Sequence, residues 1–171
     1  LFSKFGNKSK VSHTPFKRIT YTESMSKYGT DKPDLRIPLI IEDLTQVFST
    51  DEVRLDIFKK IISKDGVVKA IKVKNVSKQP RSFFDNLNSW AKDNGAKGLA
   101  YLIFDSVNNL KEIKGPIAKF FSEKALGEII SKCSLSSGDA VFFICDKFNE
   151  AVKFSGLVRQ KLGSELNLID N

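Results

Sequence analysis

The chain has 171 residues, of which 41% are apolar and 14 are phenylalanine, so it is long enough to bury the core of one domain. Its apolar runs fall short of the roughly 18 residues that a membrane-spanning helix needs, and its first residues lack a signal-peptide pattern, so we expect no membrane association. The chain begins with Leu1 rather than Met, which we interpret as a boundary inside a longer protein.

The net charge of +8 is unevenly distributed. Residues 1–36 hold eight basic and three acidic residues, a net +5, whereas the other 135 residues hold 20 basic and 17 acidic residues, a net +3. An excess of basic charge is typical of proteins that bind nucleic acids. Because 23 of the 28 basic residues are lysine, a usage that codon bias also produces, charge alone leaves RNA binding open.

The N-terminal part is predicted to be an arm. Residues 1–14 are polar and basic, with little periodicity. Residues 21–28 are predicted to form a short helix, with Thr22 as its N-cap and Gly29 as its C-terminal stop. Pro33 then predicts a turn.

A strand and a hairpin are expected next. Residues 39–44 are predicted to form a strand, followed by one helical turn over 45–48. Apolar residues partly alternate over 53–62 and alternate well over 67–74, and the Asp65-Gly66 turn lies between these segments. This pattern predicts a β-hairpin.

Residues 80–94 are predicted to form an amphipathic helix with an aromatic face, since apolar residues recur there every three or four positions. Pro80 suits the first helical position. Trp90 lies on the aromatic face. Its ring belongs either to the core or, as an alternative, to a base-stacking site.

Two continuous apolar segments, 99–104 and 140–145, are predicted to be central strands. A short return strand is expected over 110–114 and an apolar link over 117–121. A helix should begin after Ser122. The last helix is expected over about 147–162, with Asp146 as its cap and Gly163 as its end.

The order of these elements lacks the strict alternation of a doubly wound fold. It predicts a two-layer α+β domain, in which an antiparallel or mixed sheet carries helices on one face.

The sequence contains no recognisable catalytic motif. The chain contains neither a glycine-rich phosphate-binding loop nor a nucleophile elbow, and its only histidine is His13. Cys133 and Cys145 are interpreted as reduced thiols, although a disulfide stays open. Adjacent carboxylates such as Glu42 and Asp43 point to opposite faces of a strand and are expected to be solvated. We therefore predict no catalytic, cofactor-binding or metal-binding residues.

Lysines in the glycine-containing loops are the remaining candidates. Lys97 lies within Gly95–Gly98, and Lys119 follows Gly115-Pro116. Turn geometry explains the glycines but not these lysines. Each is either a phosphate contact or an ordinary surface side chain.

Six segments, taken in order, carry a family resemblance: PFKRITYTESMSKYGTDKPDLR (15–36), VVKAIKVK, GAKGLAYLIFD, KGPIAKFF, SGDAVFFICD and LVRQKLGSELNLID. The first resembles the stretch after motif 2 of bacterial-type aspartyl-tRNA synthetases. The others resemble the insertion between motifs 2 and 3 of those enzymes, which is the GAD domain shared with the B subunit of glutamyl-tRNA amidotransferase. The resemblance extends from Pro15 to Asp170.

The resemblance implies a DCoH-like α+β fold and three parts: a partial catalytic-domain segment (1–36), the GAD insertion (37–166) and the start of a return to the catalytic domain (167–171). The parent enzyme would be a cytoplasmic homodimer that joins aspartate to tRNA through an aspartyl-adenylate, using ATP and Mg²⁺. Motifs 2 and 3 are absent here, so this piece should be inactive and hold no cofactor. It would help place the tRNA acceptor end, through Lys97, Lys114 and Lys119. Alternatively, it is a structural or protein-interaction module.

Overall fold

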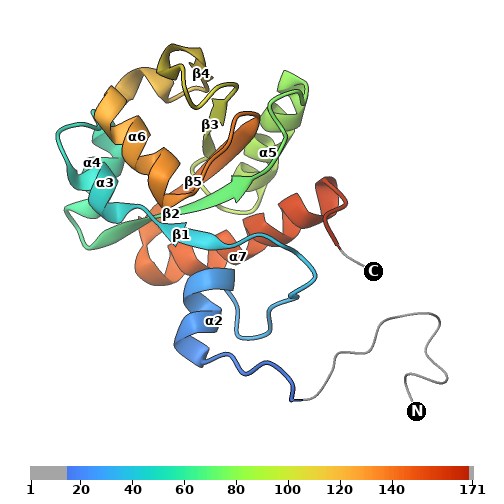
Figure 1. Cartoon of the computed structure of the whole chain (residues 1–171). Coiled ribbons are helices and arrows are strands. Elements are labelled where there is room, and N and C mark those ends of the chain that lie inside the picture. Colours follow the sequence, from blue (N-terminus) through green and yellow to red (C-terminus); the bar gives the residue numbers. More distant parts are fainter. Residues whose placement is uncertain (1–14, 170–171) are drawn as a thin grey trace.

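The computed structural model describes residues 15–169, so the expectations for residues 1–14, including His13, lie outside the described residues. A five-stranded sheet occupies the centre of the molecule, in the order β1-β2-β5-β3-β4, with every neighbouring pair antiparallel (Figure 1). The strands are β1 (Ile41–Asp43), β2 (Gly66–Val73), β3 (Ala100–Phe104), β4 (Ile113–Lys114) and β5 (Asp139–Lys147).

Helices connect the strands and precede the sheet. They are α2 (Tyr21–Tyr28), α3 (Thr45–Ser49), α4 (Asp56–Ile62), α5 (Arg81–Asp93), α6 (Glu123–Lys132) and α7 (Phe148–Glu165), with 3-10 turns η1 (Leu110–Glu112) and η2 (Ala118–Phe120). The predicted α+β class and the antiparallel sheet are confirmed.

The helices cover both faces of the sheet, so the expected two-layer arrangement with helices on one face is wrong. Phe143 of β5 belongs to a core cluster with residues of α3 and α6, and α4 packs against the same face. Its neighbour Phe142 belongs to a second cluster, with residues of α5 and α7. Residues 140–145 are apolar at every position, which is typical of a strand buried on both faces.

The predicted hairpin of 53–62 with 67–74 is also wrong. Residues 56–62 form α4, and β2 pairs with β1 on one side and with β5 on the other. Leu55, Phe58 and Ile62 have helical spacing and pack into the same core cluster, which outweighs the short alternation before Phe58. Asp65, with φ of 59°, connects α4 to β2.

Several helix ends differ from expectation. Thr20, not Thr22, caps α2 by accepting a hydrogen bond from the amide of Glu23 at 3.1 Å, while Gly29 ends α2 as predicted, with φ of 73°. Gly163 does not end α7. It lies inside the helix and faces Ile37. A Cβ at this position would come within 2.9 Å of the Ile37 side chain, so glycine permits close packing there.

Two other end predictions are corrected. Pro80 is the N-cap of α5 rather than its first helical residue. Lys147, not Asp146, is the N-cap of α7, and the Asp146 carboxylate accepts a hydrogen bond from the Lys147 amide at 2.8 Å. Ser122 does cap α6, by accepting from the amide of Ala125 at 3.2 Å.

The arm is fixed to α7. Figure 1 shows α2 beside α7, and the two helices meet where Gly29 faces Gly156. Arg159, only 1% exposed, donates hydrogen bonds to backbone carbonyls of the segment that leads from the arm into β1. The part of the arm that the structure describes therefore packs on the domain.

A cavity at the open end of β5

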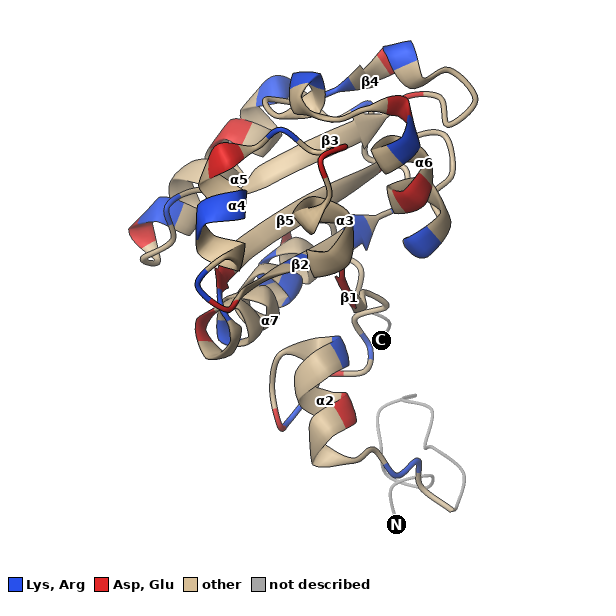
Figure 2. Cartoon of the chain, turned by 90° about the vertical axis from the view of Figure 1, so that its left-hand side faces the viewer, with Lys and Arg blue, Asp and Glu red and all other residues tan. Residues whose placement is uncertain are grey.

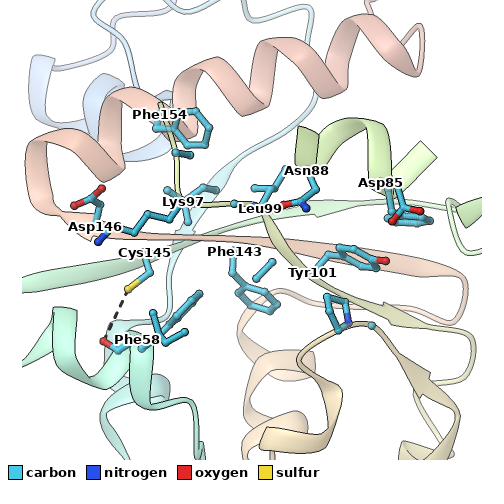
Figure 3. A pocket seen from close by; sticks show the side chains of 18 of the residues that line it. Phe58, Asp85, Asn88, Lys97, Leu99, Tyr101, Phe143, Cys145, Asp146 and Phe154 are labelled. Atoms are coloured by element: carbon cyan, nitrogen blue, oxygen red, sulfur yellow. Dashed lines mark hydrogen bonds between the residues drawn. The ribbon is translucent and has the colours of Figure 1, made fainter. Parts of the chain in front are cut away.

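A cavity of about 960 Å³ lies beside the C-terminal half of β5 (Figure 3). Strand β3 pairs with β5 only as far as Ala100 opposite Phe143. Beyond that point β5 continues to Lys147 with β2 as its strand partner. The incomplete pairing leaves room between β5, α4 and the loop of residues 94–99.

Local hydrogen bonds turn this loop away from β5. The Leu99 amide donates to Oδ1 of Asn88 at 2.9 Å, and the Ala96 amide donates to the Ala91 carbonyl at 3.0 Å, so both bonds tie the loop to α5. Gly98 adopts φ of 150°, which disfavours other residues, and a Cβ there would lie 3.1 Å from Asn88 Oδ1. The sequence of the loop thus keeps the cavity open.

The lining of the cavity includes the half-buried rings of Phe58, Tyr101 and Phe154 and the buried rings of Phe84 and Phe143. Tyr101 stacks on Phe84 with ring centroids 4.6 Å apart, and Phe154 stacks on Trp90 at 6.0 Å. Phe58 of α4 lies on the other side of β5 from Phe154 (Figure 3). Trp90 packs against the core, which agrees with the first of the two interpretations of its ring. Burial raises the pKa of Tyr101 above its usual value of 10.0.

Polar groups lie at one end of the cavity. Figure 3 shows the exposed Lys97 side chain with its amino group near Asp146 and Cys145. Within residues 15–169, Lys97 forms no ion pair. Burial raises the pKa of the Cys145 thiol to about 12, so this thiol is protonated and a poor nucleophile at neutral pH. Glu150 completes this end.

The structure brings together two of the three lysines singled out from the sequence. Lys97 and Lys114 both line the cavity. Lys114 forms an ion pair with Asp105, whose hydrogen bond and charge raise the pKa of Lys114. Lys119 does not line the cavity, and its amino group lies 5.2 Å from the centre of the Phe120 ring.

Sequence reasoning missed Tyr101 and Asn88, which lie on elements that were interpreted only as core strand and core helix. The pair Gly95 and Gly98 is the sequence signal that could have indicated them. Two glycines directly before a central strand indicate a bend in the chain, and a bend there can leave a cavity beside the strand.

Residues 15–169 contain no group of three His, Cys, Asp or Glu side chains placed to hold a metal ion. Cys133 and Cys145 are both free, as expected for reduced thiols. No helix in the same range combines the length and apolar composition needed to cross a membrane. An antiparallel α+β domain with one large, partly aromatic cavity is thus the class that fold and site define.

Comparison with known proteins narrows this class to a family. Residues 58–155 match the family model described as the GAD domain, so the chain belongs to the GAD domain family. Proteins named aspartate–tRNA(Asp/Asn) ligase match nearly the whole chain. Those of Beijerinckia indica subsp. indica and Rickettsia prowazekii are both 49% identical to it, and that of Pelagibacter ubique is 47% identical. The resemblance read from the sequence is confirmed.

The alignments cover 98% to 99% of this chain but only 27% to 28% of the three ligases. The chain therefore spans a little more than a quarter of the length of these relatives.

Proposed function

We propose that this chain is the inserted, non-catalytic domain of a ligase that joins aspartate to tRNA through an aspartyl-adenylate, and that it helps to place the tRNA acceptor end. The observation that supports this placement most directly is that Lys97 and Lys114, which lie 17 positions apart in the sequence, line one cavity. The names of the relatives support tRNA as the partner. ATP and Mg²⁺ would bind to other parts of the whole protein.

The charge of the domain agrees with a positioning role. Lysine contacts to phosphates orient a nucleic acid without reading its sequence. Figure 2 shows Lys and Arg interspersed with Asp and Glu along the ribbon, rather than gathered on one part of the domain. We therefore expect weak binding of tRNA that decreases with salt.

Titration of labelled tRNA into this chain at two salt concentrations tests the proposal. The triple variant Lys97→Gln, Lys114→Gln, Lys119→Gln should lower the affinity and flatten its dependence on salt by roughly one unit of log–log slope per lost phosphate contact. The matched control changes three other exposed lysines, Lys78, Lys132 and Lys153, to glutamine. Binding that is absent at low salt, or indifferent to salt, would contradict direct contact.

A separate measurement tests the non-catalytic assignment. This chain should show no aspartate- and ATP-dependent pyrophosphate exchange, whereas the whole ligase should show it. Exchange catalysed by this chain alone would overturn the assignment. Charging assays of the whole ligase with both tRNAs would show whether it uses tRNA(Asp) and tRNA(Asn), as the names of the relatives state for those proteins.

A structural or protein-interaction role is the second candidate, and exposed apolar side chains on the arm favour it. Phe16 and Tyr21 are 67% and 71% exposed. An exposed patch formed by Phe83, Phe121 or Phe154 would support the same role, but these three side chains are half-buried against the core. Phe16→Ser with Tyr21→Ser should then weaken homodimerisation or activity of the whole ligase without changing tRNA binding by this chain. Unchanged dimer and activity would contradict this role.

A further inference from the structure

We propose that the cavity at the open end of β5 takes a single unpaired nucleotide of RNA, with its base against the aromatic wall and its phosphate at Lys97. This inference rests on the proposed function and makes it more specific, since it names the part of the tRNA that the domain would hold. Four features of the cavity carry it: size, wall, charge and access.

The size of the cavity suits a nucleotide. Small-molecule sites commonly enclose roughly 300–1,000 Å³, and the volume here is about 960 Å³. An RNA duplex, which is many times larger, does not fit such a volume. A base can enter only after it has left the helical stack, as a base in a single-stranded end already has.

The wall offers surfaces on which a base can stack. Tyr101 is held in place by Phe84, whose ring is nearly parallel to it at an interplanar angle of 24°. Phe154 is held in the same way by Trp90, at an angle of 22°. A stacking ring that its neighbour already orients loses little conformational freedom when a ligand binds. Aromatic stacking binds all four bases, so this wall predicts little sequence preference.

The charges around the cavity favour one phosphate rather than several. Lys97 forms no ion pair within the described residues and is available to a phosphate, whereas Lys114 and Arg81 are already paired with Asp105 and Asp85. Asp146 lies near the Lys97 amino group (Figure 3), and Glu150 also lines the cavity. These carboxylates would repel the closely spaced phosphates of a duplex. A single phosphate bound at Lys97 would lie closer to the ammonium group than to the carboxylates, so attraction would exceed repulsion.

The open edge of β5 offers backbone groups to the edge of a base. Beyond Phe143, β5 has no strand partner on the side of β3 among residues 15–169. Backbone amides and carbonyls of a strand edge that lacks a partner remain free to bind another molecule. The side-chain oxygen Oδ1 of Asn88 is less available to a base, because it already accepts a hydrogen bond from the Leu99 amide.

The test uses a single-stranded RNA tetranucleotide and a blunt-ended RNA duplex of the same composition. Trp90, the only tryptophan, reports on the site because its ring contacts Phe154. We expect the tetranucleotide to bind more tightly than the duplex and to change the Trp90 fluorescence. Tyr101→Leu should weaken tetranucleotide binding about tenfold, and Lys97→Gln should weaken it about threefold and lower the salt slope by about 0.7.

Lys132→Gln on α6 is the control, because it removes the same charge outside the cavity and should leave binding unchanged. Thermal melts show whether Tyr101→Leu is folded, and Lys97→Gln, at an exposed position, tests the proposal independently. Equal affinity for tetranucleotide and duplex, or wild-type binding by both cavity variants, would overturn the proposal.

The possible results distinguish failure of the cavity proposal from failure of the proposed function. If tRNA binds with salt-dependent affinity but the cavity variants bind it normally, the cavity proposal falls and the proposed function stands. If no RNA binds at all, both fall. If an extended apolar peptide changes the Trp90 fluorescence and the tetranucleotide does not, the cavity is a protein-docking site and the nucleotide proposal is wrong.

Discussion

The Nε atom of Arg159 donates a hydrogen bond to the carbonyl of Leu39 at 2.7 Å, across 120 positions of the chain. The same guanidinium donates to the carbonyls of Asp34 at 2.8 Å and Ile37 at 2.7 Å, and its carbon lies 5.0 Å from the centre of the Tyr28 ring. Burial lowers the pKa of Arg159 below its usual value. One side chain of α7 thus holds the whole segment between the arm and β1.

Replacing Arg159 with methionine should lower the free energy of unfolding by about 3–5 kcal/mol, because backbone carbonyls would be left without partners in a buried site. Urea denaturation measures the loss. Arg54→Met, at an exposed position, is the control and should change stability by less than about 0.5 kcal/mol. Equal effects of the two substitutions would show that the guanidinium does not hold the segment.

Gly156→Ala should destabilise the chain by about 2 kcal/mol, because the added Cβ would lie 2.6 Å from the carbonyl oxygen of Gly29 and would push α2 away from α7. Gly127→Ala in α6 is the matched control. A Cβ there meets nothing within 4 Å, so we expect that variant to be more stable by about 0.5–1 kcal/mol. Thermal melts of both variants give the comparison, and opposite signs are the diagnostic result.

Asp43 should make stability depend on pH. Burial alone would raise its pKa, but hydrogen bonds from the Lys69 amino group at 2.8 Å and from Thr45 outweigh burial and hold the pKa below 3.8. The stabilisation is therefore complete above about pH 4 and is lost as the pH falls through the lowered folded-state pKa.

Asp43→Asn should cost about 2 kcal/mol at pH 7, because the Lys69 side chain is only 5% exposed and would lose its partner. That difference from the wild type should vanish at the acid end of a series of urea titrations from pH 7 to pH 2.5. Asp51→Asn breaks a more exposed ion pair with Lys59 and serves as the control, with little effect at any pH. A pH-independent loss in Asp43→Asn would refute the ionic explanation.

Both cysteines should react slowly in the folded chain. Burial raises the pKa of Cys133 and of Cys145 to about 12 from 9.0, so their contribution to stability is complete below pH 9 and is lost as the pH rises through about 12. At pH 8 we expect thiol-reactive dye to modify them at least about a hundredfold more slowly than in urea. Cys145, which is less buried, should react before Cys133. Fast modification of either thiol in the folded chain would contradict this.

Much of the local structure was predictable from the sequence. The helix of 81–93, the strands of 100–104 and 139–147 and the cap at Ser122 follow from signals that lie within a few residues of one another. The hairpin failed because Leu55, Phe58 and Ile62 carry both a short alternation and a helical period. Packing of α4 on the sheet decides between them, and no local signal records that packing.

The sequence by itself determined the family, the α+β class, the absence of recognisable catalytic motifs and the lysines worth testing, because these depend on residue identities in order. Only the tertiary structure decided that helices cover both faces, that Arg159 reaches residues 34–39, and that Lys97 and Lys114 share a cavity while Lys119 does not. The physical reason is that these contacts join residues distant in sequence. The point at which β3 leaves β5 is set by hydrogen bonds from loop 94–99 to α5, and strand patterning does not reveal it.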